Sequence, residues 1–322
     1  MMNQLQKEEP IVRRAVFLGS KTLGLRVFQA LIPASLGISW SIVHPNDSHD
    51  TRSAMHEWKK AARTLDVDLL ISSSATQTSE IIRDMRPDIA FVCGWYQLLD
   101  EETLSRVPRG FWGVHNSLLP KYRGGSPLTW SILNGDDVVG CTVFELADGM
   151  DSGRVLLQVK VSNHVDDSIG SLLTKIEDSL IRKLPGKWLE VLNGNCVTRE
   201  QNNDEATYCG QRLESDGEID WNMDGKRIHD FVRAQSPPYP GAFTYLRGQK
   251  LAIFKTSPHP LPYFGTPGQV LSRNSESGGV LIAAGSATAI NVLEVSSEGE
   301  TQRAVDLLTS NRIRLGDRLS TV

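Results

Sequence analysis

Few cysteines and no long apolar run mark this chain of 322 residues. None of the four cysteines forms a Cys-x-x-Cys pair, and Cys93 and Cys141 stand in apolar stretches where a thiol packs as a small hydrophobic group. This usage predicts a reducing compartment. No apolar run reaches bilayer length, and the polar amino terminus lacks the apolar core of a signal peptide. The sequence therefore predicts a cytoplasmic protein without a membrane partner.

An excess of positive charge is also missing. The formal net charge is -4, and acidic residues balance the lysines and arginines over residues 206–322. Because phosphate contacts supply most of the binding energy for a nucleic acid, a protein without a basic surface is a poor candidate for that partner. The composition therefore predicts no nucleic-acid partner.

Apolar runs and amphipathic segments alternate along the first two thirds of the chain. Strands are expected at 15–20, 38–44, 68–73, 88–95, 110–117, 139–147 and 155–162, and helices at 23–32, 55–65, 79–87, 101–107, 128–134 and 168–192. The fully apolar strand at 88–95 suits the middle of a parallel sheet. This alternation predicts an α/β fold of the Rossmann-like type, an open and mostly parallel sheet with helices on both faces.

The pattern changes after the last of these helices. Polar residues dominate 193–206, which indicates a linker or an exposed crossover. Beyond it, one helix at 226–235 precedes short alternating strands separated by glycine, proline and serine turns, as in a small OB-like β-barrel. We expect a flexible tail at 1–12, a catalytic domain at 13–200 and a carboxyl-terminal barrel domain at 206–318.

Two polar loops fall short of recognised binding motifs. The segment 17–24 (FLGSKTLG) lacks the spacing of a dinucleotide or phosphate loop, so a tight turn is the favoured interpretation. The loop after the second strand holds several potential metal ligands, whose spacing matches no usual metal motif: His44, Asp47, His49, Asp50 and His56. No metal is expected.

A histidine at the end of a strand is the stronger candidate. If 110–117 is a strand, Gly113, His115 and Ser117 share one face. In open α/β sheets, ligands bind at the carboxyl ends of the strands. The alternative is a hydrogen-bonded structural histidine, and the residues alone leave both interpretations open.

The loop 145–153 (ELADGMDSG) brings acids after a later strand. Either Asp148 or Asp151 would fix the tautomer of His115 and favour its charged form if it lay beside the imidazole. The alternative is an ordinary turn with solvated acids.

Together these segments resemble a known family. The run HNSLLPKYRGGSPLTW followed by DGMDSG is similar to the folate-dependent formyltransferases. The later segments ATYCGQR, DGEIDW, IHDFVRAQSPPYPGAF and RLGDRLS resemble the carboxyl-terminal domain of methionyl-tRNA formyltransferase. The likeness extends over about residues 13–318. It is greatest to nucleotide-sugar N-formyltransferases such as the 4-amino-arabinose formyltransferase domain.

The resemblance implies an enzyme that transfers a formyl group from 10-formyltetrahydrofolate to a primary amine. It assigns the catalytic histidine to His115 and its aspartate partner to Asp151. The folate contacts that it implies come mainly from backbone groups of Trp95, Gln97, Leu98, Leu99, Ala147, Asp148, Gly149 and Met150. Candidate contacts to the acceptor are Ser117, Arg123 and Tyr239.

Gly113 departs from the family pattern. It stands where the family usually has an asparagine that helps to hold the formyl oxygen, and the loss of one such donor costs about 2.7 to 4 kcal/mol of barrier in other enzymes. In one explanation, a protonated His115, with water or a substrate group in the vacated space, supplies the missing hydrogen bonds and activity is retained. In the other, the chain is a catalytically impaired homologue that binds folate or a nucleotide sugar. We expect activity because His115 and Asp151 are both present.

The acceptor is expected to be a small amine. The balanced charge argues against a methionyl-tRNA formyltransferase, the alternative assignment, and PPYPGAF and DGEIDW resemble the sugar-nucleotide branch. We therefore predict a nucleotide-linked amino sugar as acceptor. By analogy with such relatives, a homodimer is also expected.

Overall fold

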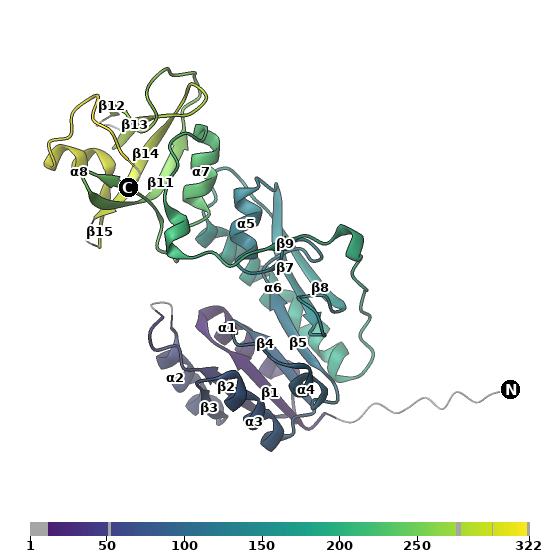
Figure 1. Cartoon of the computed structure of the whole chain (residues 1–322). Coiled ribbons are helices and arrows are strands. Elements are labelled where there is room, and N and C mark those ends of the chain that lie inside the picture. Colours follow the sequence, from purple (N-terminus) through teal and green to yellow (C-terminus); the bar gives the residue numbers. More distant parts are fainter. Residues whose placement is uncertain (1–11, 51–52, 275–277, 298, 321–322) are drawn as a thin grey trace. The chain divides into compact units, whose positions relative to one another are not determined.

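The first sheet occupies the amino-terminal part of the computed structural model, which describes residues 12–50, 53–274, 278–297 and 299–320. Only Val12 of the tail predicted at 1–12 belongs to the described residues. The seven strands of this sheet are β1 (Arg14–Gly19), β2 (Ser39–Pro45), β3 (Asp68–Ser72), β4 (Ile89–Cys93), β5 (Phe111–His115), β7 (Val138–Glu145) and β8 (Val155–Ser162) (Figure 1).

The strand order is β3-β2-β1-β4-β5-β7-β8. The first four neighbouring pairs are parallel, and β5 pairs with β7 in the antiparallel direction. The order reverses between β1 and β4, so the chain leaves a crevice at the carboxyl ends of these strands, where open α/β sheets bind ligands.

The helices that accompany this sheet begin where the periodicity of the sequence changes. They are α1 (Lys21–Leu31), α2 (Met55–Leu65), α3 (Ala75–Met85), α4 (Glu101–Ser105), α5 (Pro127–Leu133) and α6 (Ile169–Leu192). Three starts carry side-chain caps: Ser74 Oγ accepts the amide proton of Gln77 at 3.1 Å, Asp100 accepts that of Thr103 at 2.8 Å, and Ser168 Oγ accepts that of Ser171 at 3.3 Å.

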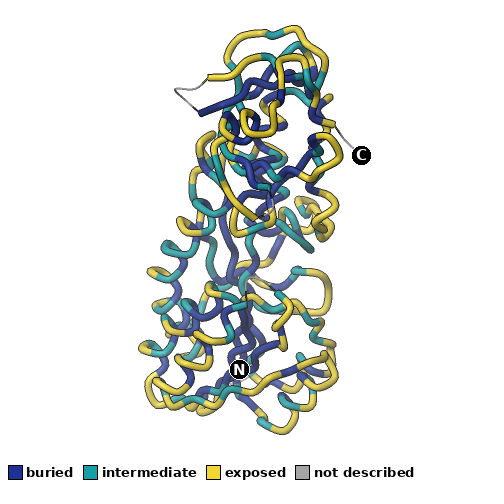
Figure 2. The backbone as a smooth tube through the Cα atoms, turned by 90° about the vertical axis from the view of Figure 1, so that its left-hand side faces the viewer, coloured by how far each residue is buried: buried dark blue, intermediate teal, exposed yellow. Residues whose placement is uncertain are grey.

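Helices cover both faces of the sheet, because the strands are apolar on both sides. Phe17 of β1 contacts Phe28 of α1 and Trp58 of α2, with ring centroids 5.2 and 5.7 Å away. Its neighbours Val16 and Leu18 point to the other face and join a core with Ile82 of α3. All residues of β1 except the first are buried, the class that Figure 2 draws in dark blue. The predicted fold class is therefore confirmed for the first sheet.

The second sheet is antiparallel, with the order β10-β11-β14-β13-β12 and with β15 paired to β14. Its strands are β10 (Ala242–Leu246), β11 (Gln249–Pro258), β12 (Val270–Asn274), β13 (Gly279–Ala284), β14 (Thr288–Ser297) and β15 (Glu300–Arg303). Bridges from Ser320 to Tyr245 and from Arg318 to Gln269 join the end of the chain to both edges of the sheet. These bridges close it in the manner of the predicted barrel.

Two helices flank the second sheet, α7 (Gly225–Arg233) and α8 (Ala304–Ser310). Helix α8 and strand β15 were not expected from the sequence, because the short run around 300–310 alternates weakly and carries no turn residue between strand and helix. None of the helices in the described ranges has both the length and the apolar character needed to cross a bilayer.

The chain divides into two compact units that do not follow one cut in the sequence. The first contains the chain up to Gly124, Gly140–Lys160 and Ile176–Tyr208, and the second contains Gly125–Val139, Val161–Lys175 and Cys209–Val322. Within the second unit, Arg233 of α7 donates to Asn163 Oδ1 at 2.6 Å and to the carbonyl of Asp167 at 3.0 Å. The domain limits 13–200 and 206–318 stay predictions.

Candidate active site

A cavity of about 590 Å³ lies in the first unit at the carboxyl ends of β4 and β5. We call it the reaction cavity. Its walls come from the segment after β4, from α4, from β5 and from the loop that joins β7 to β8. The lining residues include Gly94, Trp95, Gln97, Leu98, Leu99, Gly113, His115, Gly124, Leu146, Ala147, Asp148, Gly149, Met150 and Asp151. The predicted catalytic and folate-contacting residues therefore line one cavity.

His115 ends β5 and is buried. Its Nε2 lies 2.7 Å from the carbonyl oxygen of Tyr122, which is an acceptor only, so Nε2 carries the proton. The neutral ring then has its basic lone pair on Nδ1, which lies 3.6 Å from Asp151 Oδ2. The hydrogen bond to Tyr122 thus selects the tautomer in which Nδ1 accepts a proton next to a carboxylate.

Asp151 is held by its backbone as well as by its carboxylate. Oδ2 accepts the amide proton of Gly124 at 2.8 Å. The residue has a φ of +47°, in the left-handed region, which costs a non-glycine residue about 1 to 2 kcal/mol. Aspartate and asparagine enter this region more readily than most residues. The strained turn directs the carboxylate toward His115.

Gln201 fixes the other side of the same turn. Its Nε2 donates to the carbonyls of Asp151 and Gly153 at 2.8 and 2.7 Å. Its Oε1 accepts from Nε and Nη2 of Arg123 at 3.2 and 2.8 Å. Gln201 lies in the segment predicted as a linker or crossover, and it is buried. A single glutamine in a polar run gave no signal of this role.

Arg123 is 2% exposed and does not line the reaction cavity. Besides Gln201, it donates to Asn203 Oδ1 at 2.9 Å and to the hydroxyl of Tyr208 at 3.2 Å. These contacts make Arg123 a positioning residue for the turn of Asp151. Its predicted contact with the acceptor stays a prediction.

Gly113 leaves no empty space behind it. A Cβ atom at this position would lie 2.6 Å from Cδ1 of Leu146 and 3.6 Å from the carbonyl oxygen of Val92. The side chain of Leu146 therefore occupies the space that a larger residue would need. The expectation that water or a substrate group fills this space has to be revised, because an apolar side chain packs there.

The rim of the cavity is apolar, although it faces solvent. Leu98 is 80% exposed and Met150 is 60% exposed, and they lie in the two loops that flank the cavity. Trp95 Nε1 is buried and has no hydrogen-bond partner among the described residues. Apolar walls with a few unpaired polar atoms suit a flat heteroaromatic ligand, which supplies both stacking area and acceptors.

The cavity entrance also carries a fixed negative charge. Hydrogen bonds from the side chain and backbone of Thr103 hold the pKa of the Asp100 carboxyl below its ordinary value. Asp100 thus remains ionised at neutral pH, where it caps α4.

Two predicted acceptor contacts, Ser117 and Tyr239, are not among the residues that line the reaction cavity. Ser117 is buried, and its Oγ donates to the carbonyl of Lys121 at 2.6 Å, which ties the loop after β5 together. Tyr239 belongs to the second unit. Their contacts with the acceptor stay predictions.

The acids after β2 form ion pairs. Lys21 Nζ lies 3.0 Å from Asp47 and 2.7 Å from Asp50. Within the described ranges, no three His, Cys, Asp or Glu side chains gather as a metal site. Lys21 also occupies the 17–24 turn, where Gly19 packs tightly against the carbonyl of Cys93.

An open α/β sheet with a histidine–carboxylate pair in a cavity at its carboxyl edge, followed by a small antiparallel barrel, defines a class of two-domain α/β transferases. Two family models match the chain: "Formyl transferase" over residues 43–185 and "Formyl transferase, C-terminal domain" over residues 213–312. The chain belongs to the formyl transferase family, and the resemblance inferred from the sequence is confirmed.

Solved structures share the fold at low sequence identity. HypX from Aquifex aeolicus, in complex with tetrahydrofolic acid, has a TM-score of 0.66 and 16% identity over 96% of this chain. The chain spans 49% of that protein's length. An N-formyltransferase from Helicobacter canadensis, in complex with folinic acid and dTDP-3-aminofucose, gives 0.67 and 15% over 87% of this chain and 98% of its own. A 4-N formyltransferase from Francisella tularensis gives 0.63 and 17% over 75% and 96%.

Proposed function

We propose that this protein is an N-formyltransferase that moves a formyl group from 10-formyltetrahydrofolate to the primary amine of a nucleotide-linked amino sugar. The single observation that carries the proposal is the pairing of His115 Nδ1 with Asp151 Oδ2, 3.6 Å apart, inside the reaction cavity. Family membership supports the formyl group as the unit transferred.

Proton transfer is the first task of this pair. An amine that attacks a formyl carbon must lose a proton, and the free Nδ1 of His115 is the basic atom next to the cavity. Once Nδ1 carries a proton, the carboxylate of Asp151 stabilises the imidazolium and keeps it in place. General base catalysis of this kind contributes roughly a hundredfold to ten-thousandfold in rate.

The cavity suits a reduced folate. Trp95, Leu98 and Met150 would contact the ring system, and the backbone of 147–150 would face its polar edge. The unpaired Nε1 of Trp95 is a donor for such a ligand. The folate supplies an activated one-carbon unit, and the residues of the cavity hold it next to His115 and exclude water.

Gly113 and Leu146 limit the ways of stabilising the developing oxyanion. The apolar Leu146 supplies no hydrogen bond where the family usually has an asparagine amide. The protonated Nδ1 of His115 remains as a charged donor. We infer a slower chemical step than an additional amide donor would give, since one donor is worth about 2.7 to 4 kcal/mol of barrier.

The acceptor follows from charge and from the relatives. The net charge of -4 offers no general attraction for a tRNA. The Helicobacter canadensis relative was solved with dTDP-3-aminofucose. Homodimer formation and a cytoplasmic location stay predictions from the sequence.

A panel of acceptors tests the proposal. The full chain is incubated with 10-formyltetrahydrofolate and, separately, dTDP-linked 3-amino sugars, dTDP-linked 4-amino sugars or initiator methionyl-tRNA, and products are analysed by mass spectrometry. Formylation of an amino sugar is the expected result. Formylation of the tRNA alone would favour the methionyl-tRNA formyltransferase alternative. Folate binding without transfer to any acceptor would favour the impaired homologue.

A further inference from the structure

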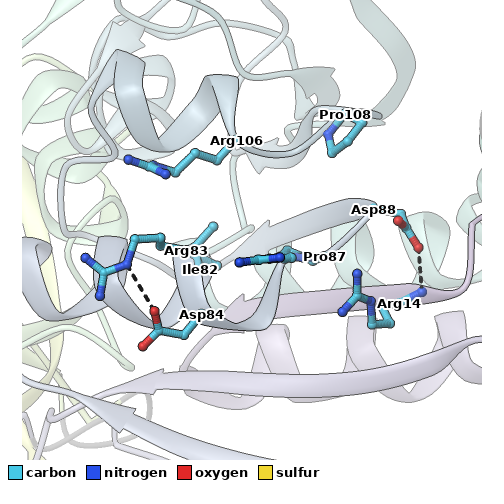
Figure 3. A pocket seen from close by; sticks show the side chains of 9 residues that line it. Arg14, Ile82, Arg83, Asp84, Pro87, Asp88, Arg106 and Pro108 are labelled. Atoms are coloured by element: carbon cyan, nitrogen blue, oxygen red, sulfur yellow. Dashed lines mark hydrogen bonds and ion pairs between the residues drawn. The ribbon is translucent and has the colours of Figure 1, made fainter.

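A second hollow lies in the first unit, at the other edge of the sheet. It has a volume of about 780 Å³, larger than the reaction cavity. We call it the arginine hollow. Its lining is Arg14, Ile82, Arg83, Asp84, Arg86, Pro87, Asp88, Arg106 and Pro108. Figure 3 shows Arg106 and Pro108 on one side of it and Arg83 and Arg14 on the other. Four arginines against two aspartates leave this surface positive.

Both aspartates of the arginine hollow already have partners within the protein. The Oδ2 atom of Asp88 accepts the backbone amide protons of Arg13 and Arg14, both at 2.8 Å. Asp84 pairs with its sequence neighbour Arg83 at 3.0 Å. Outside the lining, Glu102 pairs with Arg106 one helical turn away. The guanidinium groups of Arg83 and Arg106 are therefore each engaged on one side by a neighbouring carboxylate.

The remaining two arginines carry no such partner. Within the part of the chain that the structure describes, the guanidinium groups of Arg14 and Arg86 make no hydrogen bond and no ion pair. A guanidinium presents five donors in a planar fork that matches phosphate and carboxylate oxygens. Two unpaired forks therefore border one hollow whose floor is the buried, apolar Ile82 and Pro87.

The backbone at Arg86 is unusual for an arginine. This residue ends α3 in the left-handed region with a φ of +48°, where glycine or asparagine is the usual choice. Cations near helix carboxyl ends are favoured by the helix dipole, which accounts for a positive residue at Arg83. The dipole does not explain Arg14, which starts a strand and lines the same hollow.

The arginine hollow is separate from the reaction cavity. Arg14 begins β1, Asp88 precedes β4 and Pro108 precedes β5, so the hollow lies at the amino ends of parallel strands. The reaction cavity lies at their carboxyl ends. Helix α4 connects the two, since Glu101 lines the cavity and Arg106 lines the hollow.

We propose that the arginine hollow is a binding site for a small ligand with two or more phosphate or carboxylate groups, independent of the formyl-transfer site. Arg14 and Arg86 grip the ligand through their free donor forks, and Arg83 and Arg106 add charge from either side (Figure 3). A ligand with two anionic groups spans the width of the hollow, whereas a single anion engages one side of it.

Isothermal titration calorimetry with inorganic pyrophosphate is the first test, on the full chain at low ionic strength. The binding expected is in the micromolar to low millimolar range and weakens several-fold when salt is raised to about 0.15 M, because exposed charges are screened. Inorganic phosphate is expected to bind at least about tenfold more weakly than pyrophosphate. No heat of binding at any salt concentration, either with pyrophosphate or with the tri-γ-glutamate tested below, would overturn the proposal.

Variants locate the site. Arg14→Gln and Arg86→Gly are each expected to weaken pyrophosphate binding about tenfold, as loss of one charge-assisted contact does. Arg86→Gly also relieves the left-handed backbone, so the variant is expected to melt at or above the temperature of the parent while it binds less. Weaker pyrophosphate binding with an unchanged or higher melting temperature indicates a lost ligand contact and excludes a loss of folding.

Arg63→Ala is the matched control. Arg63 is exposed in the last turn of α2, as Arg83 is in the last turn of α3, and it does not line the arginine hollow. Both replacements remove the same helix-dipole contact. Arg83→Ala is expected to weaken binding several-fold and Arg63→Ala to leave it unchanged. Equal effects of the two, or full binding by the Arg14→Gln/Arg86→Gly double variant, would overturn the proposal.

A second titration distinguishes the sources of the anion. Tri-γ-glutamate carries carboxylates spaced along a chain, and pyrophosphate represents the diphosphate of a nucleotide. The site is supported if either ligand binds and Arg86→Gly weakens that binding. The ligand that binds more tightly indicates whether the natural ligand carries phosphate or carboxylate groups. Failure of both ligands to respond to the variants would contradict it.

Discussion

The two edges of the first sheet are built in opposite ways. At the carboxyl edge, His115 and Asp151 are each tied by hydrogen bonds to backbone atoms, and the turn that holds Asp151 is braced by the buried Gln201. At the amino edge, Arg14 and Arg86 stand on the surface, and no side chain in the described ranges of the chain accepts from their guanidinium groups. The first arrangement fixes atoms for a reaction, and the second offers charge to a ligand.

The two edges are expected to differ in how far they tolerate substitutions. A proton transfer needs its acceptor within a few tenths of an ångström, so loss of a bracing residue reaches the chemistry. Attraction between charges falls off gradually with distance, so each arginine adds its own part. Substitutions at the carboxyl edge are therefore expected to lower rates steeply, and those at the amino edge to lower affinity in steps.

The largest effect is expected from Asp151→Asn. The asparagine keeps the size and tolerates the left-handed backbone but cannot stabilise the charged ring of His115, so kcat is expected to fall at least a hundredfold. Asp66→Asn is the control, because Asp66 is an exposed aspartate with a φ of +52°. Steady-state rates of formyl transfer measure both. An Asp151→Asn variant within threefold of the parent would contradict the assigned role.

Gly113→Asn ranks next. The new side chain must displace Leu146, whose Cδ1 lies 2.6 Å from the position of the added Cβ, and overpacking of this kind costs about 1 to 3 kcal/mol. Tetrahydrofolate affinity, measured by calorimetry, is expected to fall about tenfold.

Adding Leu146→Ala to Gly113→Asn frees the space and is expected to restore affinity and to raise kcat above that of Leu146→Ala alone, because the amide supplies an oxyanion donor. If the double variant binds as weakly as Gly113→Asn, Leu146 does not control this wall of the cavity.

Gln201→Ala is expected to have a smaller effect on rate than Asp151→Asn. It leaves the carbonyls of Asp151 and Gly153 without their donor, which costs about 1 to 3 kcal/mol of stability. We expect kcat to fall several-fold with little change in KM, since the turn of Asp151 loosens. Gln201→Glu keeps an acceptor for Arg123 but loses both donations, and it should lower kcat to a similar extent. A change in thermal stability alone, with kcat unchanged, would limit Gln201 to a structural role.

The smallest effect is expected at His44, which lines neither the reaction cavity nor the arginine hollow and affects only the pH dependence of stability. Burial lowers the pKa of His44, and among the residues that the structure describes its Nε2 finds no hydrogen-bond partner. The unfolded chain therefore binds a proton more readily, so this histidine contributes stability that is present above pH 6.5 and is lost as the pH falls below that value. His44→Asn should flatten the dependence of the unfolding free energy on pH as the pH falls below 6.5. An unchanged slope in urea melts would contradict this.

The sequence carried most of the fold because its signals are local. The apolar run at 88–95 and the periodicity at 55–65 became β4 and α2, and the helix bounds at 55–65 agree residue for residue. Strand β15 and helix α8 were missed because a short exposed strand has little apolar alternation. The grouping of 125–139 and 161–175 with the carboxyl-terminal residues depends on tertiary contacts, so no local sequence pattern predicts it.

The residues of the candidate site also fall into those that the sequence indicated and those that only the structure revealed. His115 and the pair Asp148 and Asp151 could be named as candidates because titratable residues after apolar strands gather at the carboxyl ends of a sheet. The choice of Asp151 over Asp148 came from the resemblance to the formyltransferases. Leu146 and Gln201 gave no local signal, since a leucine after a strand and a glutamine in a polar run are ordinary. Their roles come from the packing of Leu146 on Gly113 and the hydrogen bonds of Gln201 to the turn of Asp151.

Single-turnover formyl transfer by His115→Asn, measured together with tetrahydrofolate binding, tests whether His115 is the base of the reaction. We expect folate affinity within about threefold of the parent and a transfer rate at least a hundredfold lower, because the variant loses the basic Nδ1 atom next to Asp151. A His115→Asn variant that transfers the formyl group to the amino sugar as fast as the parent would contradict this role.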